Sequence, residues 1–190
     1  MSKVAVELRT DRLLLRPWNF SDRDAFAELN ADPKVREYFP GLLSREESNA
    51  SVTRIEAHFA AHGYGFWAVE APGVAPFIGM VGLANLELDA HFAPCVEIGW
   101  RLARPYWGRG YATEAARAAL EFGFDVLQLK EIVAFTASIN ARSRRVMERI
   151  GMSYAPADDF EHPSVAEGHA LRKHVLYRTA QSGSAGGMKF

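Results

Sequence analysis

The chain has 190 residues, of which 48% are apolar and 24% are charged, a composition typical of a soluble globular protein. Its net charge of −1 argues against a nucleic-acid binder that relies on a general basic field, and no segment has the apolar run of a signal peptide or a membrane span. The single cysteine, Cys95, excludes an intramolecular disulfide and is expected to be a buried small residue. We therefore expect one cytoplasmic domain over residues 1–190, a monomer or homodimer without a membrane or nucleic-acid partner, with its core at about 7–178 and a frayed tail from 181.

Hydrophobic periodicity and turn residues divide the chain into strands and helices. In chain order the pattern predicts a strand at 12–16, helices at 21–31 and 44–62, strands at 66–70, 77–83 and 95–102, a helix at 111–127, a strand at 131–136, a helix at 141–150, and strands near 152–156 and 169–178. Ser44 and Glu47 have the spacing of a capping box, and Ser21 and Asn140 are predicted N-caps. Three consecutive strands give an antiparallel part, and the later strand–helix–strand gives a parallel crossover. We therefore expect a mixed α/β (α+β) sheet with flanking helices.

A glycine-rich loop connects the strand at 95–102 to the helix that follows it. Gly108 and Gly110 let the backbone turn tightly and approach a ligand without a Cβ in the way. The helix start then offers unpaired N–H groups and the positive end of its dipole, which together suit a phosphate. A simple turn is the alternative reading. A dinucleotide fingerprint is not complete, because Thr113 stands where the third glycine would be, and the Gly-Lys-Ser/Thr of a Walker loop is missing.

The segment 104–115 resembles the pyrophosphate-binding loop of the GNAT acetyltransferases, whose pattern is Gln/Arg-x-x-Gly-x-Gly/Ala. Here residues 107–112 read Trp-Gly-Arg-Gly-Tyr-Ala, and Trp107 in place of Gln/Arg is similar to the branch that contains the ribosomal-protein N-terminal acetyltransferases. The strand at 12–17 and the Asn-x-x-Ser helix at 140–152 resemble the same branch. The resemblance implies a GNAT-type fold, with a mostly antiparallel twisted sheet and a splayed parallel strand pair. It also implies transfer of an acetyl group from acetyl-CoA to a primary amine.

The resemblance further implies where acetyl-CoA, the co-substrate, would bind, and it implies no metal. The residues implied to contact it are Trp100, Arg101, Leu102, Trp107, Gly108, Arg109, Gly110, Tyr111, Ala112, Thr113, Asn140 and Ser143. The first three would bind the pantetheine arm through their backbone, and the loop would hold the pyrophosphate. Of the arginines on the helix at 141–150, one of Arg142, Arg144 and Arg145 would meet the ribose phosphate, unless together they form a solvated basic face.

Few side chains are needed for the chemistry. Glu97, on the strand beside the site, is the candidate base, acting directly or through water; the alternative is that it faces solvent or forms an ion pair. Many relatives carry a tyrosine acid where this chain has Met147, and Ser143 is the hydroxyl that the branch supplies instead. Its alternative role is helix capping at the third position. His58 and His62 lack the glutamate and the third ligand of a metal site.

The acceptor is the least determined part of the expectation. The α-amine of a protein N-terminus comes first, by resemblance to the branch alone. A small-molecule amine, such as an antibiotic, a polyamine or an amino acid, is the nearest rival, and a non-catalytic acyl-CoA sensor is the rival from a different class. Five aromatic residues either line an acceptor pocket or belong to the core. They are Trp18, Tyr38, Phe39, Phe66 and Trp67.

Overall fold

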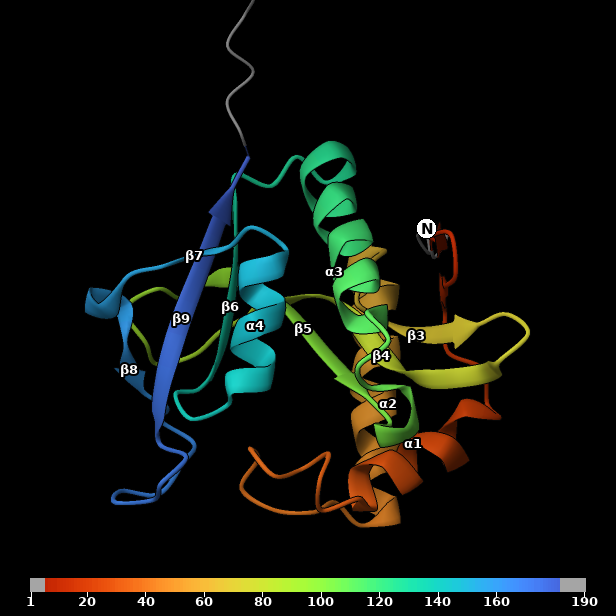
Figure 1. Ribbon diagram of the computed structural model, residues 1–190, viewed down its shortest axis with the longest axis horizontal. Coiled ribbons are helices and arrows are strands. Elements are labelled where there is room, and N and C mark those ends of the chain that lie inside the picture. Colours follow the sequence, from red (N-terminus) through yellow and green to blue (C-terminus); the bar gives the residue numbers. More distant parts are fainter. Residues whose placement is uncertain (1–5, 182–190) are drawn as a thin grey trace, which may run out of the picture.

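The computed structural model describes residues 6–181, which form one nine-stranded sheet with helices on both faces (Figure 1). The strands are β1 (Leu8–Arg9), β2 (Leu14–Arg16), β3 (Phe66–Ala71), β4 (Ala75–Leu86), β5 (Cys95–Leu102), β6 (Glu131–Ala137), β7 (Ser153–Tyr154), β8 (Phe160–Glu161) and β9 (Lys173–Ala180). The α-helices are α1 (Asp22–Ala31), α2 (Arg45–His62), α3 (Tyr111–Glu121) and α4 (Ala141–Arg149). No helix within residues 6–181 is long and apolar enough to cross a membrane.

The strand order is β1-β2-β3-β4-β5-β6-β9-β7, with β8 also paired to β9. All neighbours are antiparallel except β5 and β6, which are parallel and are connected through α3. The predicted mixed sheet, its central hairpin of β3 and β4 and its one crossover are thus confirmed. Two very short strands, β1 and β8, were not predicted, and the tail at 182–190 lies outside the described residues.

Two of the three predicted N-caps form, at Ser44 and Asn140. Ser44 and Glu47 form both halves of the predicted capping box, and Gly63 ends α2 in the left-handed conformation. Ser21 precedes α1 but its side chain caps nothing, so that prediction is wrong. The Asp22 carboxylate, at the first position of α1, accepts a 2.7 Å hydrogen bond from the Asn19 N–H, which precedes the helix, and forms an ion pair with Arg16.

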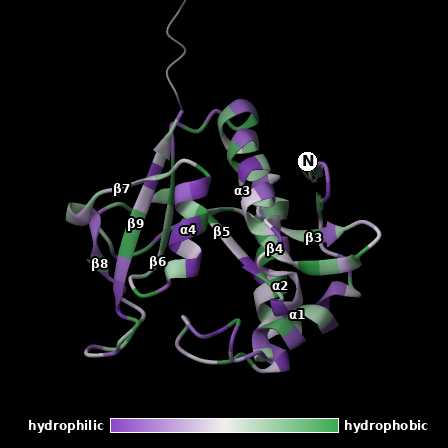
Figure 2. Cartoon of the chain, viewed as in Figure 1, coloured by the Kyte–Doolittle hydropathy of each residue, from purple (hydrophilic) through white to green (hydrophobic). Residues whose placement is uncertain are grey.

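The sheet packs against a pair of helices on each face. On one face, Phe26 of α1 and Val52 of α2 pack against Met80 of β4, and we call this the α1–α2 face. On the other, three fully buried alanines of α3 let that helix lie close to Trp67 and Val81, and we call this the α3–α4 face. The alanines are Ala115, Ala116 and Ala119. Figure 1 shows α3 and α4 side by side, and α4 is largely hydrophilic in Figure 2.

Candidate active site

Strands β5 and β6 pair at one point and then separate. Glu97 is the β5 residue that lies opposite Val133 of β6. Beyond this bridge, β5 stays with β4 as far as Leu102, and β6 stays with β9 as far as Ala137. A cavity of about 830 Å³ opens in the gap. The splayed pair that the resemblance implied is therefore present, and the unpaired edges of two strands line the space between them.

The cavity extends through the sheet, because β5 and β6 separate and side chains from both faces of β5 line the gap. Ile98 and Leu102 point to the α3–α4 face, where they join the core beneath α3. Arg101 lies opposite Met80, on the α1–α2 face, and Glu97 shares that face because it is four residues away along the strand. Residues of both sets line the one cavity.

Backbone N–H groups of β5 face the gap. Just past the strand, Ala103 donates its N–H to the Ile78 carbonyl of β4 at 2.9 Å. Because successive backbone groups point to opposite sides of a strand, the N–H groups of Trp100 and Leu102 point away from β4. The Trp107 indole N–H donates a 2.7 Å hydrogen bond to the Leu102 carbonyl. The Trp100 N–H is thus directed into the gap, where it can donate to a bound carbonyl.

The glycine loop delivers an uncapped helix start to the cavity. Gly108 and Gly110 have φ of +73° and +82°, which a residue with a Cβ rarely adopts. Gly110 directly precedes α3, and no side chain caps that helix. The first intrahelical bond of α3 runs from the Glu114 N–H to the Gly110 carbonyl, so the preceding N–H groups have no acceptor within the helix. Together with the helix dipole they form a site for a phosphate.

Glu114, in the first turn of α3, does not place its carboxylate at this phosphate site. The Glu114 carboxylate instead accepts hydrogen bonds from the Thr10 hydroxyl at 2.6 Å and from Arg12 Nε at 2.7 Å. Arg12 also donates to the Arg109 carbonyl at 3.0 Å. Glu114 and Arg12 therefore fix the loop to the turn between β1 and β2 and keep the negative charge away from the exposed N–H groups.

Helix α4 forms the opposite wall. Asn140 caps it, accepting from the Ser143 N–H at 3.2 Å and donating to the Thr136 hydroxyl at 2.9 Å. Both halves of the Asn140 amide thus have structural partners. The Ser143 hydroxyl has no hydrogen-bond partner within residues 6–181 and lines the cavity, as does Met147, which is buried.

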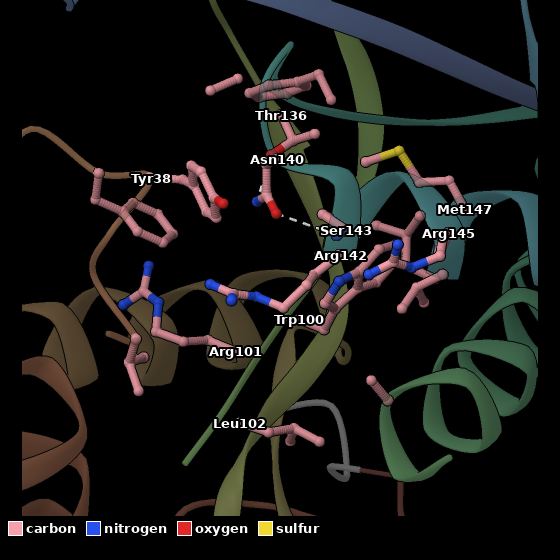
Figure 3. A pocket seen from close by; sticks show the side chains of 18 of the residues that line it. Tyr38, Trp100, Arg101, Leu102, Thr136, Asn140, Arg142, Ser143, Arg145 and Met147 are labelled. Carbon is pink, nitrogen blue, oxygen red and sulfur yellow. Dashed lines mark hydrogen bonds between the residues drawn. The ribbon is translucent and has the colours of Figure 1, made fainter. Parts of the chain in front are cut away.

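The arginines of α4 divide into two groups. Arg144 turns away from the cavity, donating to the Tyr177 hydroxyl and to the Ser138 carbonyl. Arg142, Arg145 and Arg149 line it. Arg142 spans its mouth, with an ion pair to Glu37 at 2.5 Å and its guanidinium 4.7 Å from the centre of a Trp107 ring. Figure 3 shows Arg145 and Met147 together on α4 and the Arg142 side chain extending from it.

Glu97 has the properties of a proton acceptor. Its carboxylate makes no hydrogen bond or ion pair within the described part of the chain, which counts against the structural role considered for it. Burial raises the pKa of Glu97 from its usual 4.5 to about 7, because desolvation penalises the charged form. A carboxyl group with this pKa exchanges protons readily near neutral pH, which suits a general base.

Of the residues predicted to form the site, all but Arg109 line the cavity. Arg109 is exposed and contributes its carbonyl to Arg12. Among the aromatic candidates, Tyr38, Phe39 and Phe66 line the cavity. Trp18 instead packs on Phe26 of α1, and Trp67 is fully buried in the core.

Several lining residues were not predicted. Phe135, His162 and His174 line the cavity on the α1–α2 face, where the His162 and His174 rings lie 4.8 Å apart. The pKa of each histidine is lowered by burial. Their elements meet only through the pairing of β8 and β9 with the sheet, so no local sequence signal joins them. His58, for which the sequence pattern indicated no metal site, hydrogen-bonds through its two ring nitrogens to the Tyr64 carbonyl and the Asn85 N–H. No group of three or more potential metal ligands occurs within residues 6–181.

Comparison with known proteins agrees with this geometry. The sequence model of the Acetyltransferase (GNAT) domain matches residues 12–153. The chain belongs to the GNAT acetyltransferase family. The Bacillus subtilis (strain 168) protein YkkB is 35% identical over 152 residues, which is 78% of this chain and 86% of YkkB. This GNAT protein is accordingly an acetyl-CoA-dependent N-acetyltransferase.

Solved structures share the same GNAT fold. A GNAT-family acetyltransferase from Bacillus anthracis superposes with a TM-score of 0.76 at 28% identity, covering 92% of this chain and 98% of that one. The ribosomal-protein-S5-alanine acetyltransferase of Vibrio fischeri superposes with a TM-score of 0.73 at 16% identity, covering 94% and 98% of the two chains. The second match agrees in fold with the branch that the sequence resembles.

Proposed function

We propose that this enzyme transfers the acetyl group directly from acetyl-CoA to a primary amine, which approaches from the α1–α2 face and gives its proton to Glu97. One observation carries the proposal. A single cavity connects the uncapped start of α3 to the unpaired Glu97 carboxylate through the gap between β5 and β6. The phosphate end of the co-substrate and the amine would thus occupy opposite faces of the sheet.

The lining residues suit acetyl-CoA. The N–H groups at 111–113 would hold the pyrophosphate, and a Cβ at Gly108 would meet nothing within 4 Å, which leaves open space beside them. Of Arg142, Arg144 and Arg145, only Arg145 lines the same cavity without a hydrogen-bond or ion-pair partner among residues 6–181, so it is the candidate among these three for the ribose phosphate. The exposed edge of β5 at Trp100 would receive the pantetheine arm.

The remaining chemistry rests on three groups of this chain. Acetyl-CoA supplies an activated acetyl carbonyl and a thiolate leaving group. Glu97 accepts the proton of the incoming ammonium, and the Trp100 N–H donates to the carbonyl oxygen as negative charge develops there. As the C–S bond breaks, Ser143 donates its hydroxyl proton to the leaving sulfur and takes up the second proton of the nitrogen, which is lost when the amide forms. Cys95 is not a competing nucleophile, because burial raises the pKa of its thiol to about 11.

A polypeptide α-amine remains the first acceptor, supported by the resemblance of the segment 107–115. A small amine is the second, and one observation about the entrance to the cavity fits both acceptors. Tyr38 packs against Val165 and Leu171, so the loops before α2 and before β9 meet over the α1–α2 side of the splay and narrow its entrance. A slender N-terminus or a small molecule fits such an entrance better than a folded surface.

A screen that follows CoA release tests the proposal, with peptides of different N-termini and small amines assayed side by side. Calorimetry should show saturable binding of acetyl-CoA without added metal, and the melting temperature should rise with ligand concentration as mass action requires. Turnover with at least one amine class is expected. Binding with no turnover on any amine would instead support the non-catalytic sensor.

A further inference from the structure

The charges that line the main cavity are strongly unbalanced. Glu97 is the sole carboxylate among its described lining residues. The five basic side chains are Lys34, Arg101, Arg142, Arg145 and Arg149. Three of these are on α4, where the phosphates of acetyl-CoA account for them. Lys34 has Glu37 at 3.5 Å. Arg101 remains without an explanation.

Arg101 is a cation held without a counter-ion. Its Nη1 donates to Asn30 Oδ1 at 2.8 Å, and its guanidinium carbon lies 4.3 Å from the centre of the Phe39 ring. Its Nε is enclosed and has no acceptor, and no carboxylate within residues 6–181 forms an ion pair with it. Burial and the nearby Arg36 lower the pKa of Arg101 to about 9, so the side chain still carries its charge at neutral pH. An enclosed, uncompensated charge is costly, and a bound anion would offset that cost.

The region behind Arg101 is also positive. A second cavity of about 440 Å³ adjoins the first and shares Arg101, Phe66 and Met80 with it. Its other cationic lining residues are Arg36 and Arg54, and no acid lines it among the described residues. Both cavities therefore direct positive potential toward the same place on the α1–α2 face, which is the face opposite the glycine loop.

The spacing of Arg101 from the base defines where an anion would lie. Glu97 and Arg101 are four residues apart on one face of β5, which corresponds to about 13 Å along the strand. Tyr38 and Arg101 lie on the same side of the cavity in Figure 3, away from Arg145 and Met147. A molecule whose amine reaches Glu97 from the α1–α2 face would thus extend its other end along β5 toward Arg101.

We infer that the acceptor is an anionic amine, whose carboxylate or phosphate group is bound by Arg101 while its amine lies at Glu97. This inference rests on the proposed function for the position of the amine. Asn30 holds the guanidinium from one side and Phe39 packs against its face, so the group is positioned before the acceptor arrives. Arg101 acts here as a residue that selects the acceptor, and it takes no part in proton transfer.

Four linear amines of matched length test the inference: aminocaproate, aminohexyl phosphate, aminocaproamide and hexamethylenediamine. We expect kcat/KM to be roughly 10–100-fold higher for one or both anionic amines than for the neutral amide. This ratio corresponds to the free energy of one hydrogen bond to a charged group. Comparison of the two anions distinguishes a carboxylate from a phosphate. In Arg101→Gln, the KM for the preferred anion should rise far more than the KM for the amide, so that the preference disappears. Arg101→Lys should restore part of the preference. Arg104→Gln, an equal loss of charge outside the cavity, is the matched control.

A binding measurement keeps the two proposals separable. Caproate and caproamide are titrated against the protein saturated with CoA, and the melting temperature is followed. Wild type should be stabilised by the acid only, and Arg101→Gln by neither, while calorimetry confirms that both proteins bind acetyl-CoA. If no amine is acetylated but caproate binds through Arg101, the proposed transfer fails and the anion site stands. Equal response to acid and amide in wild type, or an acid preference that survives in Arg101→Gln, would overturn the inference.

Discussion

On the α3–α4 face, the cavity is bounded by backbone N–H groups and two glycines from the continuous segment 107–113. On the α1–α2 face, it is bounded by side chains that come from distant segments, among them Tyr38, Arg101 and His174. The first arrangement depends on backbone conformation and tolerates many side chains, so it suits a ligand shared by a whole family. The second depends on which side chains this chain carries, so it suits a ligand specific to this enzyme. The two faces should therefore respond differently to substitution.

The largest effect is expected from Glu97→Gln, which removes the base from the α1–α2 side of the cavity. Turnover should fall by roughly 10²–10⁴, the usual contribution of acid–base catalysis, with acetyl-CoA affinity nearly unchanged. In wild type the rate should rise with pH as Glu97 loses its proton near pH 7, and in the variant the optimum should move upward. Steady-state rates across pH test this. Glu121→Gln, on the exposed surface of α3, is the control with the same change of charge.

Gly110→Val should change acetyl-CoA affinity, which Glu97→Gln leaves nearly unchanged. Binding should weaken by about 10²-fold, because a Cβ at φ +82° disturbs the start of α3. Gly73→Val is a matched control, since Gly73 has φ +76°, has open space around it and lies in the turn between β3 and β4. Both variants should lose about 1–2 kcal/mol of unfolding free energy from backbone strain. Calorimetry should show that only Gly110→Val loses affinity; equal affinity in the two variants would mean that the loop is only a turn.

Ser143→Ala tests the proposed acid. Turnover should fall by about 10²-fold or less, because a thiolate is already a fair leaving group, and acetyl-CoA affinity should not change. Since Asn140 bonds the Ser143 backbone and not its hydroxyl, helix capping should survive the substitution. Circular dichroism and melting temperature check that α4 is intact. An unchanged rate would assign proton donation to water.

The smallest effect concerns stability. In the unfolded chain Glu97 has its usual pKa of 4.5, and in the folded protein its pKa is about 7. The folded state therefore binds the proton more tightly, and stability falls as pH rises between these values. Glu97→Gln removes this dependence. The gain in unfolding free energy of the variant over wild type should therefore be larger at pH 8 than at pH 4, by about 1 kcal/mol once solvent in the cavity is allowed for. Urea unfolding at the two pH values measures the difference.

The sequence predicted best what local chemistry determines. The capping box of α2, the bounds of β5 and the start of α3 at Tyr111 all depend on residues that are neighbours in the chain, whereas the splay was expected from the family resemblance alone. Strands β1 and β8 were missed because each has two residues and exists only through its pairing partner. Ser21 was a wrong cap because its side chain makes no capping hydrogen bond, and the next residue, Asp22, is held by its ion pair with the buried Arg16.

The acceptor side was largely beyond prediction from sequence. Arg101 was expected to contribute its backbone to the co-substrate. Its spacing of four residues from Glu97 was the signal that its side chain shares the face of Glu97, which is the face opposite the glycine loop. His162 and His174 reach the cavity because β8 and β9 pair next to β6, which is a consequence of the whole sheet. The family resemblance could not identify these side chains, because they lie outside the segments that carry it.

Initial-velocity measurements with acetyl-CoA and the best amine, each varied at several fixed concentrations of the other, test direct transfer across the splay. If both molecules occupy the cavity together, the double-reciprocal plots should intersect, and the intact mass of the enzyme incubated with acetyl-CoA alone should not increase. Parallel lines, together with an acetylated enzyme of increased mass, would show a covalent intermediate and contradict the account.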